Sequence, residues 1–506
     1  MMCQTHTKNT RQSIQPKRHA IWLSVALSMV GINSSHAEIS ENHAATAPSN
    51  QPLQALSRLS SLATPSQQAL RTPNVQSFRT TQGTRVLFVQ ASELPMLDIR
   101  LTFDAGSARD QSLSTGDGKS LSGLASLTAQ LLFEATSTQN TDQIAASFES
   151  LGAQYSAAAY RDMFTIELRS LTDPAYLQPA VTQWLDAVRD AQFPESSVTR
   201  ILQSAETGQK QRKDSPSATA GIRFWRELYG THPYAEPSTG SMASLKNINV
   251  QHVQQFRQRY LVAQNATIAI TGNLSRAQAV SLAEQITASL PQGQAASAIP
   301  DPQPLTAARL VHVPFNASQS HIIIGQIGVK RSAPAADLAA LAVANDILGG
   351  DGFTARLTQE LREKRGLTYG AYSSFVQMRS NGPFMINYST RGDQAAASIE
   401  IAKQTLRDFV AQGVTADAVE EAKQGMLNSY PLSLSSNSNI NAFLGIIGFY
   451  QLPVTYLADY PAQIAAVTAA DVQRVLQQYL QPEQLLTVVV GQALTTPATD
   501  AATVAK

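Results

Sequence analysis

The chain has 506 residues, more than one ordinary hydrophobic core accommodates, so we expect two or more domains. Its formal net charge is +1 and only 15% of its residues are charged, so neither nucleic acid nor an anionic membrane surface has an electrostatic reason to bind it. The only cysteine is Cys3, which excludes disulfides, thiolate metal sites and a cysteine nucleophile from the chain that follows it.

The first 37 residues are typical of a secretory signal peptide. Basic residues precede an apolar run at 20–32, which is too short to span a bilayer comfortably. Small residues follow, so we predict cleavage after Ala37 and export to a bacterial periplasm. An uncleaved membrane anchor is the alternative. Residues 38–77 are rich in Ser, Ala, Gln, Thr and Pro without apolar periodicity, which predicts a flexible leader.

The first folded half is predicted at residues 78–290. It opens with two strand-like segments, 84–90 and 97–106. The segment GLASLTAQLLFEAT, residues 123–136, begins with a glycine and ends in an apolar run, which predicts a buried helix. The half closes with residues 253–272, where an amphipathic helix, a short turn and a strand that ends in glycine are expected.

A linker rich in proline is predicted at residues 291–306. The second folded half follows at residues 307–495 and again opens with two strand-like segments, 309–315 and 320–329. Residues 496–506 are predicted to form a flexible tail.

The two halves repeat each other in sequence. Three pairs of segments match in the same order and at nearly the same spacing: 151–157 with 365–371, 164–173 with 384–393, and 253–272 with 472–491. A chance similarity would not keep both order and spacing. We therefore expect two homologous α+β domains, each an antiparallel sheet backed by helices.

Residues 347–375 are the richest candidate for chemistry. Gly349 and Gly350 end a predicted helix, and the segment after them again has helical spacing. Arg362 lies near the end of this second helix, and Tyr369 is expected to open a strand seven residues later. The pattern alone is also explained by a solvated charged helix followed by an ordinary strand tyrosine.

This stretch resembles the insulinase/pitrilysin family of zinc metallopeptidases, the inverzincins. The C-terminal domains of that family carry a glycine-rich loop, a helix that ends L-R-E-x-x-G-L and a tyrosine that starts a strand, and LREKRGLTYGAYSSF is similar. Residues 228–248 and 460–480 also resemble family segments, so the resemblance extends over nearly all of 78–495. It implies two homologous insulinase-like domains that form one half of a clamshell.

The family's catalytic motif, H-x-x-E-H, is absent from the stretch that resembles its surroundings. In that alignment Ser126 and Gln130 stand at the two histidine positions and Ala129 at the glutamate position. In the motif, the histidines share one helix face and bind Zn²⁺, and the glutamate takes a proton from metal-bound water. Serine, alanine and glutamine supply none of these functions, so no metal is expected on this chain. The resemblance makes Glu206 a candidate vestige of the family's third ligand.

The resemblance also implies that Arg362 and Tyr369 bind substrate backbone and stabilise the tetrahedral oxyanion, because a guanidinium and a phenol are good donors. Some bacterial members of the family place the zinc motif and the Arg/Tyr pair on two separate chains. We therefore expect a non-catalytic, metal-free subunit that acts on peptides with a zinc-bearing insulinase-like partner, as a heterodimer or heterotetramer. The alternatives are a structural or peptide-binding protein and, less favoured, an independently active zinc metallopeptidase.

Overall fold

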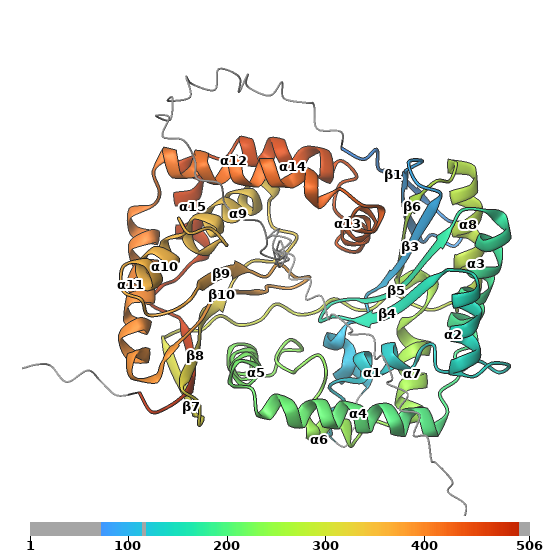
Figure 1. The fold of residues 1–506 in the computed structure, drawn as a ribbon, viewed down its shortest axis with the longest axis horizontal. Coiled ribbons are helices and arrows are strands. Elements are labelled where there is room, and N and C mark those ends of the chain that lie inside the picture. The colour runs from blue at the N-terminus through green and yellow to red at the C-terminus, as the bar shows by residue number, and fades with distance from the viewer. Residues whose placement is uncertain (1–71, 114–117, 495–506) are drawn as a thin grey trace, which may run out of the picture.

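The computed structural model describes residues 72–113 and 118–494 (Figure 1). These residues form two α+β halves, as the sequence predicted, and residues 290–308 connect them as extended chain. The predicted signal peptide, the leader as far as residue 71 and the predicted tail lie outside the described residues. No described helix is both long and apolar enough to cross a membrane.

The first half contains a six-stranded sheet in the order β1-β2-β6-β3-β5-β4. Its strands are β1 (Gln76–Arg79), β2 (Arg85–Gln90), β3 (Met96–Phe103), β4 (Gln154–Ala159), β5 (Phe164–Leu171) and β6 (Ala266–Gly272). Its helices are α1 (Leu124–Leu131), α2 (Thr141–Ser150), α3 (Pro174–Arg189), α4 (Glu195–Lys213), α5 (Pro216–Tyr229), α6 (Met242–Leu245), α7 (Val250–Tyr260) and α8 (Arg276–Ser289). The predicted leader therefore ends inside β1.

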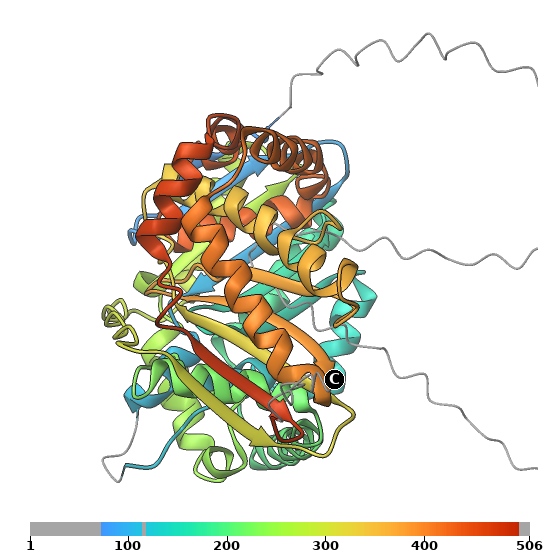
Figure 2. The same cartoon turned by 90° about the vertical axis from the view of Figure 1, so that its left-hand side faces the viewer.

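The second half contains a five-stranded sheet in the order β7-β11-β8-β10-β9. Its strands are β7 (Arg309–Pro314), β8 (Gln319–Ile327), β9 (Ala371–Phe375), β10 (Pro383–Arg391) and β11 (Leu486–Gly491). Its helices are α9 (Ala335–Gly349), α10 (Arg356–Thr358), α11 (Ala395–Gln412), α12 (Ala416–Ser433), α13 (Asn437–Phe449), α14 (Tyr456–Ala465) and α15 (Ala469–Tyr479). Figure 2 faces this half, with its helices in front of the first half.

The strand order shows that the two halves are structural repeats. Leaving out β1, the order β2-β6-β3-β5-β4 in one sheet corresponds position by position to β7-β11-β8-β10-β9 in the other. The sheets differ from the expected arrangement in one respect, because β2 pairs with β6, and β7 with β11, in parallel. Strand β6 lies between β2 and β3, and β11 lies between β7 and β8. In each case the two neighbours run in opposite directions, so the strand between them must be parallel to one of them.

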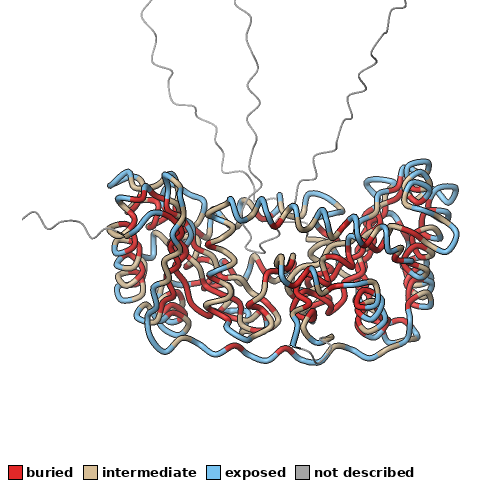
Figure 3. Tube along the Cα trace, turned by 90° about the horizontal axis from the view of Figure 1, so that it is seen from below, coloured by how far each residue is buried: buried red, intermediate tan, exposed pale blue. Residues whose placement is uncertain are grey.

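The halves exchange one helix each. Helix α5 of the first half packs on β8 and β11 of the second, and α13 of the second half packs on β3 and β6 of the first (Figure 1). Apolar side chains such as Phe224 on α5 and Leu444 on α13 are fully buried in these contacts. Figure 3 shows buried residues in the interior of both halves. Each half therefore completes the core of the other.

A buried polar network also joins the halves. The Asp162 carboxylate accepts hydrogen bonds from the Tyr234 hydroxyl of the first half and from the Tyr450 hydroxyl of the second, the latter at 3.1 Å. The backbone N–H of Arg379, also from the second half, donates to the same carboxylate at 2.6 Å. Burial raises the pKa of Asp162 against the opposing effect of these donors.

Candidate functional site

Helix α1 carries the three positions that the resemblance aligned with the metal motif, and a buried carboxylate lies at its start. Asp110 accepts hydrogen bonds from the backbone N–H groups of Gly123, at 2.7 Å, and Ala125, at 2.9 Å. These groups have no partner within the helix, and the helix dipole favours a negative charge beside them. Burial nevertheless raises the pKa of Asp110 to about 8, although the backbone hydrogen bonds oppose the shift.

The glycine at the start of α1 permits a close approach of two chain segments. Gly123 has a φ of +98°, which favours glycine, and a Cβ atom there would lie 2.9 Å from the Cα of Gly240. Gly240 also has a positive φ, +75°. The paired glycines bring the loop that precedes α6 against the start of α1, and so close one end of the pocket described next.

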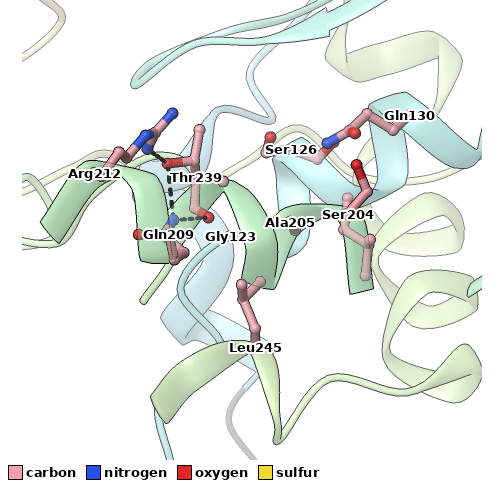
Figure 4. Close-up of a pocket in the computed structure, with 11 residues that line it drawn as sticks. Gly123, Ser126, Gln130, Ser204, Ala205, Gln209, Arg212, Thr239 and Leu245 are labelled. Atoms are coloured by element: carbon pink, nitrogen blue, oxygen red, sulfur yellow. Dashed lines mark hydrogen bonds between the residues drawn. The ribbon is translucent and has the colours of Figure 1, made fainter. Parts of the chain in front are cut away.

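A pocket of about 180 Å³ lies between α1 and α4 (Figure 4). Ser126 and Gln130 project from α1, and α4 supplies the opposite wall. Ser126 and Gln130 thus share one helix face, as their spacing predicted, whereas Ala129 is buried. The polar residues that line the pocket are Ser126, Gln130, Ser204, Gln209, Arg212 and Thr239.

The lining does not fit a zinc ion. Zinc is bound in proteins by Cys, His, Asp and Glu side chains, and none of these lines the pocket. Within residues 72–113 and 118–494, no three such side chains are grouped so that they could hold a metal ion. The Gln130 amide instead donates a hydrogen bond to the backbone oxygen of Ser126 at 3.2 Å.

Glu206, which the resemblance suggested as a vestige of the third ligand, lies outside the lining of the pocket. It lies on α4, but it is not among the residues that line the pocket, whereas its neighbours Ser204 and Ala205 are. Successive residues on a helix point about 100° apart, so a shift of one or two positions turns a side chain away from the pocket. Glu206 is therefore not placed as a third ligand.

Hydrogen bonds fix the end of the pocket that the contact between Gly123 and Gly240 closes. The Arg212 guanidinium donates to the Thr239 hydroxyl, and the Gln209 amide donates to the Thr239 backbone oxygen at 3.1 Å (Figure 4). These contacts join α4 to the loop that precedes α6. No local sequence pattern predicts these contacts, because residues far apart along the chain meet only after both segments have packed.

Arg362 lies in a π-helical turn, Gln359–Glu363, and not in the continuous α-helix that the sequence predicted. The Lys364 N–H donates to the Gln359 oxygen at 3.0 Å, one residue further back than an α-helical bond. Such turns occur frequently at functional sites. The Arg362 guanidinium is 3.3 Å from the Glu363 carboxylate and lies over the ring of Phe353 at 4.9 Å.

Tyr369 precedes β9 by two residues and does not open it, because pairing with β10 begins only at Ala371. The Thr368 hydroxyl accepts a hydrogen bond from the Gly370 N–H at 3.2 Å and donates to the Gly370 oxygen at 2.9 Å, which holds the chain in a turn. The Tyr369 side chain is 87% exposed. Its hydroxyl is therefore presented to solvent at the tip of this turn.

The glycine-rich loop packs against the strand that follows Tyr369. A Cβ atom on Gly349 would lie 2.5 Å from the backbone nitrogen of Ser373, and one on Gly350 would lie 2.7 Å from the Asp346 oxygen. Larger residues would push the loop away from β9. The loop also exposes Phe353, an aromatic contact of Arg362 that the sequence reasoning missed.

The two candidate regions belong to different halves and do not form one site. Every residue that lines the α1/α4 pocket comes from the first half. Arg362 and Tyr369 lie in the second half, beside β9, which occupies the edge of its own sheet (Figure 1). The pocket lining includes neither Arg362 nor Tyr369.

Comparison with family sequence models gives two matches that together span most of the folded chain. Residues 85–222 match Insulinase (Peptidase family M16), and residues 247–426 match Peptidase M16 inactive domain. An uncharacterised zinc protease of Bacillus subtilis is 23% identical over 323 residues, 63% of this chain and 76% of the relative. Another from Mycobacterium leprae is 24% identical over 339 residues, 66% of this chain and 74% of the relative.

Solved structures give a similar result. The peptidase M16 inactive domain from Pseudomonas fluorescens superposes with a TM-score of 0.79 at 36% identity, over 84% of this chain and 99% of that one. A protease from Helicobacter pylori superposes with a TM-score of 0.73 over 83% of this chain and all of that one, and its 19% identity supports the fold alone.

Proposed function

Because the chain belongs to the insulinase family, peptidase family M16, we propose that it is the metal-free subunit of a periplasmic two-chain peptidase. A partner of the same family would carry the H-x-x-E-H motif and the zinc ion. This chain would contribute the other wall of the chamber together with Arg362 and Tyr369. The substrates would be peptides or small unfolded proteins.

One contrast within the molecule carries the proposal. The first half presents Ser126 and Gln130 where metal ligands are needed, whereas the second half keeps a half-buried Arg362 and an exposed Tyr369. An arginine and a tyrosine hydroxyl donate hydrogen bonds to a peptide carbonyl oxygen, and these bonds strengthen as that oxygen becomes negative in the transition state. They act beside an attacking nucleophile, and the described residues include no group of side chains that could hold a metal ion to activate one.

The roles divide between the chains according to this chemistry. When bound to the partner, zinc would polarise the peptide carbonyl and activate water. The residues of this chain bind and orient: the Arg362 guanidinium is held by Glu363 and Phe353, and the Tyr369 hydroxyl projects from its turn. Backbone hydrogen bonds hold the helical turn of Arg362, and the Thr368 hydroxyl holds the turn of Tyr369, which favours a preorganised site.

Reconstitution tests the proposal. The purified chain is mixed with an H-x-x-E-H chain of the same family from the same organism, and complex formation and cleavage of a quenched fluorescent peptide library are measured. The expected result is a stable complex that cleaves peptides faster than either chain alone. A mixture that cleaves no faster than the partner alone contradicts the proposal. A complex without any gain in cleavage would assign a structural or peptide-binding role.

Export is a separate part of the proposal and is tested separately. The chain should accumulate in the periplasmic fraction, and sequencing of its N-terminus should begin at Glu38. A full-length chain retained in the inner membrane would show that residues 1–37 act as an anchor.

A further inference from the structure

We propose that the pocket between α1 and α4 binds the C-terminal carboxylate of a peptide, through the Arg212 guanidinium and neutral donors around it. The pocket occupies the place of the missing cation site, and its lining has the opposite electrostatic character. The inference concerns the isolated chain and does not require that the chain act with a partner.

The charge of the lining favours an anion. Arg212 is the one ionised side chain among the residues that line the pocket. It has no carboxylate partner among the described residues, and its one hydrogen bond in the pocket goes to the Thr239 hydroxyl. A guanidinium has five N–H donors, so most of them are left for a ligand. Hydrogen bonds between a guanidinium and a carboxylate are among the strongest in proteins.

The neutral residues add donors and no competing negative charge. Hydroxyl groups of Ser126 and Ser204 face the pocket from α1 and α4, and each can donate to a carboxylate oxygen (Figure 4). The nearby acids do not neutralise Arg212. Asp110 is bound to the backbone at the start of α1, and Glu206 lies outside the lining.

The size and apolar lining indicate what the carboxylate is attached to. At about 180 Å³ the pocket is smaller than the roughly 300–1,000 Å³ of sites for drug-sized ligands, so it accommodates about one amino-acid residue. Gly208 and Ala205 leave room along α4, and Leu127 and Leu245 offer apolar contact. The structure therefore favours the last residue of a peptide, with a small aliphatic side chain.

Fluorescence anisotropy with a dansylated alanine tripeptide tests this inference. The tripeptide with a free C-terminal carboxylate should bind the whole chain at least about tenfold more tightly than its C-terminal amide, because only the acid forms charge-assisted hydrogen bonds with Arg212. Arg212→Gln should remove this preference, and Arg212→Lys should keep part of it. Lys213→Gln is the matched control, because Lys213 is an exposed cation on the same turn of α4 that does not line the pocket, and it should keep the preference.

A second variant, Ser126→Asp, tests the proposal even if the Arg212 variants fail to fold. Ser126→Asp leaves Arg212 and Thr239 in place but adds a negative charge to the pocket, so it should also weaken binding of the acid. Thermal melting shows whether each variant is folded. Equal affinity for acid and amide, or an equal loss with Lys213→Gln, overturns the proposal. Competition by free acetate at the same concentration as the tripeptide overturns the assignment to a peptide terminus.

Discussion

Asp110 links the charge state of one residue to the geometry of the pocket. Its carboxylate holds the first backbone N–H groups of α1, the helix that carries Ser126 and Gln130. Because the group is buried, its pKa is about 8 in the folded chain, whereas an exposed aspartate has a pKa of about 3.9. Folding is therefore coupled to proton uptake at this residue.

This coupling predicts a dependence of stability on pH. Between about pH 4 and pH 8 the folded state retains a proton that the unfolded state has lost, so Asp110 lowers the free energy of unfolding as the pH rises through this range. Asp110→Asn cannot titrate and should reduce that decrease, although it also weakens the cap at every pH. Urea unfolding at pH 5 and pH 8 measures the difference, and an unchanged pH dependence in the variant would contradict the assignment.

Gly123 gives a second prediction at the residue scale. Gly123→Ala should lower the free energy of unfolding by about 1–3 kcal/mol, because alanine disfavours a positive φ and its Cβ would crowd Gly240. Gly425→Ala is the control. Gly425 lies exposed within α12 with nothing near its missing Cβ, so alanine there should raise stability by up to about 1 kcal/mol. Urea unfolding measures the free energy of unfolding of both variants. Equal changes in the two would contradict a special requirement for glycine at position 123.

Single residues of the site could be predicted where a local pattern specifies them. The spacing of Ser126 and Gln130 placed both on one helix face, and both line the pocket. Arg212 and Thr239 could not be predicted, because their hydrogen bond joins segments far apart in the chain. The side on which Glu206 lies depends on helical register, which the sequence leaves uncertain by a residue or two, and Glu206 is not among the residues that line the pocket.

At the scale of elements, periodicity and repetition predicted most strands and helices. The segments expected at 84–90 and 320–329 became β2 and β8 within a residue or two. The parallel pairing of β2 with β6 was missed, because it results from insertion of β6 between β2 and β3 and leaves no local pattern. The π-helical turn at Arg362 was missed since its apolar spacing differs little from that of an α-helix.

The exchange of helices between the halves also could not be predicted from the sequence, and Gly448 illustrates the reason. An amphipathic pattern indicates that a helix face is buried but not which sheet covers it. Helix α13 approaches the first sheet so closely at Gly448 that a Cβ there would overlap the Thr267 side chain. Such close contact between halves depends on the tertiary arrangement alone.

Because of this contact, Gly448→Ala should weaken the packing between the two halves. The added methyl group should push α13 away from β6 and lower the free energy of unfolding by about 1–3 kcal/mol, as overpacking does elsewhere. Cleavage by a protease within residues 290–308 should become faster, because the halves separate more often. Gly425→Ala again serves as the control. Unchanged proteolysis of Gly448→Ala would show that α13 does not hold the halves together.

At the scale of the whole molecule, the chain has two halves, with the α1/α4 pocket in the first and the candidate donors Arg362 and Tyr369 in the second. The exchange of α5 and α13 and the network around Asp162 join the halves into one unit. Neither the α1/α4 pocket nor the Arg362/Tyr369 region is complete as a peptidase site. The proposed role beside a second chain would complete such a site.

The central claim is that this chain supplies oxyanion donors to a zinc-bearing partner, and Tyr369 tests it most directly. In the reconstituted pair, Tyr369→Phe should lower kcat/KM by about 10²–10³-fold without weakening association of the chains, because only the hydroxyl is lost. Tyr372→Phe is the matched control, since Tyr372 is another exposed tyrosine three residues on. The Tyr372→Phe pair should keep near wild-type kcat/KM. Full activity of the Tyr369→Phe pair would contradict the account.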